Sequence, residues 1–495
     1  MSRIIIQNGN MCELDLPLKF AQKLYAEFAI RHPNAFYLRT RQRGMQNWDG
    51  KIHYITKTGQ FKIGLLPKVY DMCIEMGIKP KVVDMRQPLP KVSKVVTNIG
   101  KYKLRPEQEK AVKAVINNKI GNTPFHIGVL DYTVNAGKTL IMSSLYLSYK
   151  KQLKTLLITN DSDWLNQARE EFKQYLPGED ITFVQGKVLN WSNFTIGMVQ
   201  SISRNMRFYQ KELSQIDMVL IDEADQGGSK QYQNVITRLF NTRIRIGLSG
   251  TIYMSKLAKD RVKNMNLECF FGKVIAEFKL KDSIKKGYST KTVVKMVPSK
   301  PWYGNWESEE VSYKEVYDDS ITFNKYARKM VYDRLKWNIK QDRYPALVVC
   351  KFIAHCENLC KYFKKKLGSK YNIACVHVDT PSKIRQQIMK DFREGKIDIL
   401  VSTTIIARGK NFPKLRYLLN AASMDSQEKS IQFLGRLVRT DKSKKKVYLD
   451  DLHYPGPYLD RHGKHRKQYY QRQELKVILL DKLWKKHPNH SLIKS

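Results

Sequence analysis

Short apolar runs alternate with longer amphipathic segments from about residue 100 to residue 450. Such runs are typical of strands buried on both faces of a sheet, and the amphipathic segments have the length of covering helices. This alternation predicts parallel sheets with helices on both sides. We expect strands in two series, over residues 125–130, 155–159, 195–199, 218–221 and 244–248, and over residues 346–352, 373–378, 397–402, 417–421 and 446–449.

The two series predict an α/β fold with two tandem parallel-sheet lobes, which suits a chain of 495 residues. We place lobe 1 at residues 96–280 and lobe 2, with the connection into it, at residues 281–450. The connection is expected near residues 278–302, where the sequence is basic. Residues 1–95 lack the alternation and end in a Pro-containing stretch, which predicts a small N-terminal α+β domain. We expect this domain to bind DNA or to have an accessory role. Residues 451–495 are expected to form a short basic C-terminal extension.

The charge balance indicates a polyanionic partner. Lys and Arg number 88 and Asp and Glu 46, which leaves a net charge of +42 spread along the chain. We therefore expect nucleic acid, bound mainly through its phosphate backbone with little sequence preference. No apolar stretch of ~18 residues predicts a membrane span, and the N-terminus lacks the pattern of a secretory signal. A cytoplasmic protein without a membrane partner is expected, and a monomer is favoured.

The seven cysteines are scattered and include no CxxC pair, which predicts reduced thiols rather than disulfides or a zinc ribbon. Cys356 and Cys360, with His355 beside them, have the spacing of ligands on one helix face. Without a second ligand pair, small core residues on a packed helix are the favoured interpretation.

A phosphate-binding turn is predicted at residues 133–139, which read TVNAGKT between an apolar run and a helix-like run. Backbone N–H groups at a helix N-terminus cradle phosphates. Gly137 lets the backbone approach, Lys138 reaches the β- and γ-phosphates of ATP, and the Thr139 hydroxyl holds Mg²⁺. The expected cofactor-binding residues of the turn are Asn135, Ala136, Gly137, Lys138 and Thr139. Tyr132 stands where the usual pattern has its first glycine, so an ordinary strand-turn-helix remains an alternative.

Two adjacent carboxylates, Asp222 and Glu223, follow the expected strand 218–221. Ligands bind at the carboxyl ends of strands in open α/β sheets. We expect Asp222 to hold Mg²⁺ through water and Glu223 to orient or deprotonate the water that attacks the γ-phosphate. The two carboxylates begin the tetrad DEAD at residues 222–225, and a helix cap is the alternative for this tetrad taken alone. Together with the turn at 133–139 they predict an NTPase site.

Further motifs occur in order, with LRPEQ at residues 104–108, LSGT at 248–251 and QFLGRLVR at 432–439. Here the sequence resembles the superfamily 2 helicases, which are built from two RecA-like lobes. The resemblance implies that Gln108, with Arg105 in the same motif, binds the adenine side of the nucleotide. It also implies that Ser249 and Thr251 couple hydrolysis to movement.

The same resemblance implies that Arg436 and Arg439 are arginine fingers that reach across a cleft, with Gln432 beside them. Fixed guanidinium charge stabilises the developing transition-state oxygens. The alternative for the arginine pair is a solvated basic helix. Gly409 is expected to bind the nucleotide, although Asn411 stands where the family commonly has Asp.

Nucleic-acid contacts are implied at Gln167, Gln200, Thr404 and Trp48. The segment around Trp48, GMQNWDGKI at residues 44–52, resembles an NWDG-containing motif of phage UvsW-type helicases, and a β-turn with a core tryptophan is the alternative. The run RHGKHRKQYY at residues 461–470 mixes cations with aromatics. It predicts either a grip on nucleic acid or, as we favour, a helix face with buried tyrosines.

Resemblance to the UvsW-type helicases, over about residues 40–440, implies an ATP- and Mg²⁺-dependent DNA helicase or translocase. Its substrates would be branched or duplex DNA and RNA–DNA hybrids, through R-loop or D-loop unwinding, Holliday junction branch migration and fork regression. That places the chain in phage-type recombination, repair and replication, in the host cytoplasm. Two alternatives stay open: an ATP-dependent RNA helicase, or a basic strand-annealing protein with a vestigial ATPase.

Overall fold

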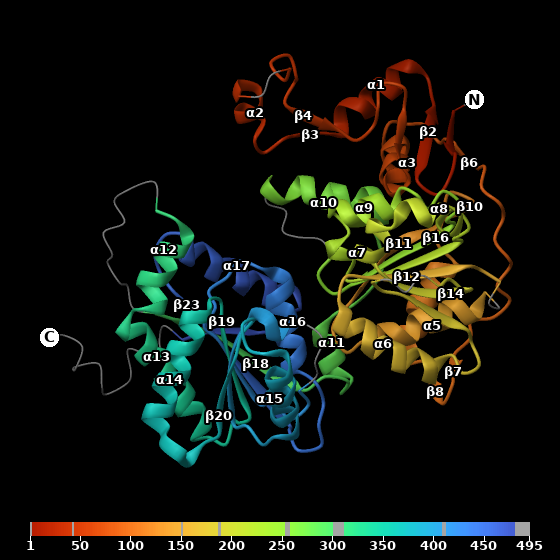
Figure 1. The fold of residues 1–495 in the computed structure, drawn as a ribbon. Helices are drawn as coiled ribbons and strands as arrows, with labels where there is room; N and C mark the ends of the chain where they lie inside the picture. The colour runs from red at the N-terminus through yellow and green to blue at the C-terminus, as the bar shows by residue number, and fades with distance from the viewer. Residues whose placement is uncertain are drawn as a thin grey trace. The chain divides into compact units, whose positions relative to one another are not determined.

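The computed structural model describes residues 2–41, 44–149, 152–186, 190–252, 258–299, 311–407 and 412–480. Their contacts divide the chain into two compact units, unit 1 over Met1–Phe278 and unit 2 over Lys279–Ser495. Figure 1 shows unit 1 in red to green and unit 2 in green to blue. Each unit is built around its own seven-stranded parallel sheet, so the predicted α/β fold with two tandem lobes is confirmed.

The sheet of unit 1 pairs its strands in parallel throughout. Its order is β13 (Ile181–Val184), β14 (Phe194–Met198), β12 (Thr155–Thr159), β15 (Met218–Asp222), β16 (Ile244–Ser249), β11 (His126–Tyr132) and β17 (Val274–Phe278). Four of these strands, β12, β14, β15 and β16, are buried at every residue. Burial on both faces is the reason that their sequences are predominantly apolar.

Helices cover both faces of this sheet (Figure 1). On one side α4 (Pro106–Ile116), α5 (Lys138–Ser148) and α6 (Ser162–Tyr175) pack in succession, with α4 against β11 and α6 against β12 and β14. On the other side lie α7 (Val199–Arg204), α9 (Lys230–Ile236) and α10 (Ala258–Phe271). The short pieces of unit 1 are α8 (Gln210–Ser214) and the strand pairs β7 (Asn98–Ile99) with β8 (Tyr102–Lys103) and β9 (Lys119–Ile120) with β10 (Thr123–Pro124).

The first 95 residues form a small α+β domain. A four-stranded mixed sheet has the order β5 (Gln60–Lys62), β2 (Met11–Asp15), β1 (Arg3–Ile6) and β6 (Lys81–Asp84). Helices α1 (Leu18–Glu27) and α3 (Leu66–Glu75) accompany the sheet. A hairpin of β3 (Ala29–Arg31) and β4 (Lys51–His53), with α2 (Ala35–Arg41) in its loop, projects from this domain in Figure 1.

This domain shares one hydrophobic core with lobe 1 and belongs to the same compact unit. Two of its glycines lie against lobe-1 backbone: a Cβ on Gly9 would come within 2.5 Å of the Leu239 carbonyl oxygen, and one on Gly64 would collide with the carbonyl oxygen of Glu268. Arg245, 1% exposed, donates from Nη2 to the Gly9 carbonyl (2.6 Å) and to Asn10 Oδ1 (2.8 Å). The N-terminal domain is thus packed on lobe 1 through backbone contacts and a buried cation.

The sheet of unit 2 repeats the parallel arrangement. Its order is β20 (Ile373–Val376), β21 (Ile399–Thr403), β19 (Ala346–Cys350), β22 (Tyr417–Asn420), β23 (Lys446–His453), β18 (Lys291–Pro298) and β24 (Val477–Leu479). Its helices are α11 (Leu280–Lys285), α12 (Tyr313–Tyr317), α13 (Lys325–Ile339), α14 (Ile353–Leu367), α15 (Ser382–Glu394), α16 (Gln427–Leu437) and α17 (Leu459–Arg472). Helices α16 and α17 pack on each other and both contact β23.

Every strand expected in the two series is found, with ends displaced by a few residues. The two units divide between Phe278 and Lys279, at the start of the stretch over residues 278–302 in which the connection is expected. The described part of that stretch is not a bare linker, because α11 and β18 lie there and β18 pairs with β23. Its lysines, Lys291 and Lys295, made β18 look unlike a buried strand. Residues 451–480 also belong to the fold of unit 2, since α17 packs on β23 and β24 pairs with β18.

In the part of the chain that the structure describes, no helix combines the length and the apolar character needed to cross a bilayer.

Candidate active site

The turn after β11 has the backbone shape of a phosphate cradle. Asn135 (φ 65°) and Gly137 (φ 71°) both adopt the left-handed conformation, and α5 begins at Lys138 immediately after. A Cβ on Gly137 would collide with Gln108 Nε2, so only glycine fits there. Both amide atoms of Asn135 are buried without a hydrogen-bond partner among the described residues. Buried polar atoms that have no hydrogen-bond partner at a helix N-terminus fit an anion-binding site.

Tyr132, the departure from the usual loop pattern, lies in the core rather than in the turn. It is the last residue of β11 and is fully buried, and its hydroxyl donates to the Glu107 carbonyl oxygen (2.8 Å). Burial raises the pKa of Tyr132 well above its usual range. Its ring and hydroxyl therefore tie the strand to α4, and the cradle itself begins at Thr133.

Gln108 holds the phosphate turn against α4. Its Nε2 donates to the Ala136 carbonyl oxygen (2.8 Å), and its Oε1 accepts from the Arg105 backbone N–H (2.8 Å). Arg105 Nη1 also donates to the Asn135 carbonyl oxygen at 3.5 Å. Gln108 is only 1% exposed and uses both ends of its amide inside the protein. The structure thus places both residues of the upstream motif beside the turn, and their contact with adenine stays a prediction.

The two carboxylates end β15, opposite the turn. Asp222 Oδ1 lies 3.9 Å from Lys138 Nζ, and Asp222 is 5% exposed. Burial raises the pKa of Asp222, and the nearby Lys138 ammonium opposes that rise. Glu223 adopts a left-handed backbone (φ 54°), a conformation that costs a non-glycine residue roughly 1 kcal/mol and is typical of functional sites.

Carboxylate and hydroxyl oxygens are the ligands that Mg²⁺ prefers, so Asp222 and Thr139 fit that ion by chemistry. The buried Asp222 Oδ1 has no hydrogen-bond partner among the described residues, which leaves an oxygen suited to a cation or its water. Both residues are therefore suited to the metal roles expected for them.

Ser249 connects the end of β16 to the acidic motif. Its hydroxyl donates to Asp225 Oδ1 (2.7 Å) and accepts from the Thr251 backbone N–H (3.1 Å). A Cβ on Gly250 would lie 3.1 Å from the Thr133 Cα, so this strand end also abuts the phosphate turn. The turn, the carboxylates and the Ser249 strand end are thus neighbours within unit 1.

Two acidic residues near this site received no role from the sequence. Asp225 is 7% exposed and accepts the Ser249 hydroxyl, and Asp161 is 8% exposed and raises the pKa of Asp222. The signal for Asp225 was its place as the last residue of the DEAD tetrad. Asp161 had no comparable signal, since its Oδ1 accepts from the Trp164 N–H as an ordinary helix cap does.

The arginine motif lies on α16 of unit 2. Ser426 caps this helix, accepting from the Lys429 N–H (3.3 Å), and Arg436 is largely buried at 9% exposure. Gln432 Nε2 donates to Glu428 Oε1 at 3.3 Å. The alternative of a solvated basic helix does not fit so buried an arginine. The residues expected at the nearby nucleotide contact, Gly409 and Asn411, lie outside the described residues.

Arg439 follows α16 and is half-buried, and its carbonyl oxygen accepts from Thr290 Oγ1 (3.1 Å). This contact ties the end of the arginine motif to the segment that leads into β18. The action of Arg436 and Arg439 on a nucleotide stays a prediction.

The four residues expected to contact nucleic acid differ in exposure. Gln167 is exposed on α6. Gln200 donates from Nε2 to the Asn160 carbonyl oxygen (3.3 Å), so the loop after β12 adjoins the first turn of α7. Thr404 Oγ1 accepts from Lys429 Nζ (3.2 Å), which joins the end of β21 to α16.

Trp48 is half-buried in a turn of the β3–β4 hairpin. Its Nε1 donates to the Lys51 carbonyl oxygen (2.9 Å), and its ring packs edge-on against His32. Asp49 Oδ1 accepts from the Lys51 N–H (2.9 Å), and Gly50 has a left-handed φ of 76°. These contacts fit the β-turn interpretation, and a DNA contact stays a prediction.

The thiols and imidazole that we considered as ligands are core residues of α14. His355, Cys356 and Cys360 are all buried, and no cysteine of the chain forms a disulfide. Across the described ranges, no group of three His, Cys, Asp or Glu residues could hold a metal ion.

Comparisons with known proteins identify two family matches in this chain. Residues 101–254 match the family "Type III restriction enzyme, res subunit", and residues 328–441 match "Helicase conserved C-terminal domain". A relative named "Putative helicase 22", from a Sulfolobus islandicus filamentous virus, is 23% identical over 383 residues, which cover 71% of this chain and 64% of that protein. The chain thus spans about two thirds of the length of this curated relative.

Two solved structures are compared with this chain. A fragment of a putative HsdR subunit of a type I restriction enzyme from Vibrio vulnificus is 15% identical with a TM-score of 0.54, covering 75% of this chain and 67% of that one. The UvsW protein of bacteriophage T4 is 19% identical with a TM-score of 0.45, covering 97% of this chain and 98% of that one. With one matched helicase domain in each unit, the chain carries both core domains of the superfamily 2 helicases.

Proposed function

We propose that this chain is an ATP-dependent helicase or translocase that acts on branched DNA. One observation carries the ATP-dependent part of the proposal: Lys138 and Asp222 face each other across 3.9 Å at the carboxyl end of the unit 1 sheet, beside a left-handed glycine turn. A lysine and a buried carboxylate at that position are the parts that a P-loop NTPase uses on its phosphates and metal.

In the proposed reaction the turn N–H groups and Lys138 hold the β- and γ-phosphates. Mg²⁺, when bound at Asp222 and Thr139, supplies positive charge that neutralises phosphate oxygens. Glu223, which follows β15 in a left-handed backbone conformation, positions the attacking water and accepts its proton. Gln108 donates to the Ala136 carbonyl oxygen and so fixes the backbone of the turn against α4.

Hydrolysis is transmitted, in this proposal, along the hydrogen bond from Ser249 to Asp225. Loss of the γ-phosphate changes the electrostatic interactions of the acidic residues 222–225. Ser249, which is hydrogen-bonded to Asp225 and to the Thr251 N–H, then shifts the loop that contains Thr251. Arg436 and Arg439 of unit 2 add guanidinium charge to the transition state. We therefore expect hydrolysis to require both units.

The partner proposed is DNA, supported by charge and by one surface of the N-terminal domain. The net charge of +42 favours phosphate contacts that depend steeply on salt. On α2, Phe36 (80% exposed) and Tyr37 (55%) lie among the exposed Arg39 and Arg41, and Arg41 lies over the Tyr37 ring at 4.9 Å. Exposed aromatics among arginines suit stacking on unpaired bases such as those at a junction. The NWDG segment around Trp48 lies in the same hairpin.

The test is nucleic-acid-stimulated ATP hydrolysis with wild type, Lys138→Ala and Arg436→Ala. We expect stimulation by DNA, and we expect both variants to lose at least about a hundredfold in kcat, as single transition-state contacts do. Lys113→Ala, which removes an exposed lysine from the same unit, is the matched control. Full turnover in both site variants would refute the site.

A second measurement addresses the substrate. Strand separation or branch migration is followed on forks, Holliday junctions, R-loops and RNA duplexes, with and without ATP. ATP-dependent activity on the branched DNA substrates supports the proposal. Activity on RNA duplexes alone identifies an RNA helicase, and annealing that needs no nucleotide together with no unwinding identifies a strand-annealing protein.

A further inference from the structure

Helix α17 makes a row of polar contacts to one short segment, Ser423 to Ser426, which we call the 423–426 segment. This segment leads directly into α16, because Ser426 is the N-cap of that helix. The favoured interpretation of this helix, a solvated face with buried tyrosines, is confirmed for Tyr469 and Tyr470. The structure also buries three basic side chains that were expected to be solvated, which are His462, His465 and Arg466.

Two backbone carbonyls of the segment accept from α17. His462 Nδ1 donates to the Ser423 carbonyl oxygen (3.1 Å), and Arg466 Nη1 donates to that of Met424 (3.0 Å). Tyr313 Oη also donates to the Ser423 carbonyl oxygen (3.1 Å). Ser423 has a left-handed φ of 42°, which a non-glycine residue keeps only where its surroundings impose it. The donors around it supply that restraint.

The next residue is held through its side chain. His465 Nδ1 lies 3.0 Å from both carboxylate oxygens of Asp425, and Tyr469 Oη donates to Oδ1 at 2.7 Å. Because an ionised carboxylate only accepts, the Nδ1 of His465 carries the proton in this contact. One turn further on, Arg472 Nη1 donates to Gln427 Oε1 (2.8 Å). Contacts from α17 therefore reach Ser423, Met424 and Asp425 in succession and then Gln427 in the first turn of α16.

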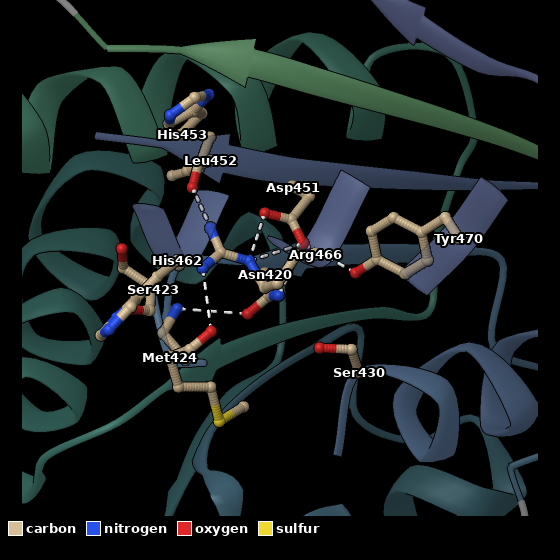
Figure 2. A network of polar contacts seen from close by, with 12 residues as sticks. Asn420, Ser423, Met424, Ser430, Asp451, Leu452, His453, His462, Arg466 and Tyr470 are labelled. Carbon is tan, nitrogen blue, oxygen red and sulfur yellow. Dashed lines mark hydrogen bonds and ion pairs between the residues drawn. The ribbon is translucent and has the colours of Figure 1, made fainter. Parts of the chain in front are cut away.

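Arg466 anchors α17 itself to the sheet. Figure 2 shows its guanidinium between Asp451, the Leu452 carbonyl and the Met424 carbonyl. Arg466 and Asp451 are both fully buried, and Asp451 also accepts from Asn420 Nδ2 (2.8 Å) and Tyr470 Oη (2.7 Å). A charge pair that has so many partners is rigid, because any movement would leave a buried charge unsatisfied.

We propose that α17 is a positioning element for ATP hydrolysis, which holds the 423–426 segment, and with it α16, in the geometry that aims Arg436. This inference rests on the proposed function. His465 and Tyr469 act through Asp425 and the Ser426 cap, and neither touches the nucleotide. The 423–426 segment depends on contacts from outside it, because Ser423 is a non-glycine residue in the left-handed conformation, which is strained.

The test compares two adjacent tyrosines of α17. Tyr469→Phe removes the hydroxyl that holds Asp425, and Tyr470→Phe removes the hydroxyl that binds Asp451 and leaves the 423–426 segment untouched. One hydrogen bond alters an equilibrium by about three- to tenfold. We expect Tyr469→Phe to lower kcat for DNA-stimulated ATP hydrolysis by that factor with the KM for ATP unchanged. Tyr470→Phe is expected to lower the melting temperature and keep kcat within about twofold of wild type.

A rescue at His465 separates positioning from simple packing. The amide nitrogen of asparagine occupies nearly the place of the imidazole Nδ1, so His465→Asn retains a donor to Asp425, whereas His465→Leu removes it. We expect His465→Leu to lose kcat and His465→Asn to recover most of it. If Tyr469→Phe and His465→Leu both keep the kcat of wild type, the proposal is wrong.

Failure of this inference is distinguishable from failure of the proposed function. If wild type shows no DNA-stimulated hydrolysis, or if Lys138→Ala retains it, the proposed function is wrong and with it the inference. If Lys138→Ala abolishes hydrolysis while Tyr469→Phe and Tyr470→Phe lose kcat equally, the effect is general destabilisation and only the positioning role is refuted.

Discussion

Lys138→Ala is expected to destabilise unit 1 even without nucleotide, because it leaves the buried Asp222 carboxylate without its neighbouring cation. Burial raises the pKa of Asp222, and attraction to Lys138 opposes that rise. Without the ammonium, the pKa rises further. The folded protein then binds a proton that the unfolded chain releases, so stability falls as pH increases. The cost of the substitution should therefore be larger at pH 8 than at pH 5.

The distance sets the size of the effect. Two unit charges 3.9 Å apart attract by about 4 kcal/mol at an effective dielectric constant of ~20. That figure is a ceiling, because protonation of Asp222 limits the cost and the Lys138 side chain is 21% exposed. We expect a loss of about 1–3 kcal/mol in the free energy of unfolding of unit 1 at pH 8.

The assay is a thermal melt from pH 5 to pH 8, without nucleotide and with EDTA, of wild type, Lys138→Ala, Asp222→Asn and the double variant. Because asparagine carries no charge, the double variant should recover most of the stability lost by Lys138→Ala. Lys113→Ala is the control: it breaks an exposed pair with Glu109 at 2.7 Å and should cost less than about 0.5 kcal/mol. A double variant that melts as low as Lys138→Ala, at every pH, would contradict the reasoning.

Three further outcomes are expected. Gly64→Ala places a methyl group into lobe-1 backbone and should lower the free energy of unfolding by about 1–3 kcal/mol, as measured by a lower melting temperature and by faster proteolysis of residues 1–95. Gly228→Ala is the tolerated control, because its methyl group would meet only a side chain at 3.7 Å. Ser249→Ala breaks the hydrogen bond to Asp225 and should reduce strand separation per ATP hydrolysed by about fivefold while hydrolysis persists, as measured by paired ATPase and unwinding assays. Burial lowers the pKa of His355 from 6.5 to about 3, so unit 2 should lose about 2 kcal/mol between pH 7 and pH 5, and thermal melts of His355→Gln, which does not titrate, should lack that loss.

The strands of both lobes could be predicted because parallel strands covered on both faces must be apolar at nearly every position. β15 and β19 are examples, since every one of their residues is buried. β18 was missed for the same reason. It lies between β23 and the short β24, keeps Lys291 exposed, and therefore departs from the apolar run that identifies a central strand.

The phosphate turn and the acidic motif were also visible in the sequence, because each is a short segment whose chemistry depends on neighbours in the chain. Other parts of the site depend on contacts between distant residues. Tyr132 looked like a defect in the turn until its hydroxyl was found on Glu107, and Gln108 looked available for adenine, although it holds Ala136. Neither contact leaves a periodic signal.

By itself the sequence determined two parallel sheets, a phosphate turn after the first strand of lobe 1 and a basic chain suited to nucleic acid. It could do so because apolar periodicity and local motifs are properties of neighbouring residues. Only the tertiary structure decided which polar groups are buried. Arg466 and Asp451 are charged residues that can leave water only because partners from β22, β23 and the 423–426 segment converge on them. A buried charge is stabilised by groups distant in the chain, so its position follows from the fold and not from the residues beside it.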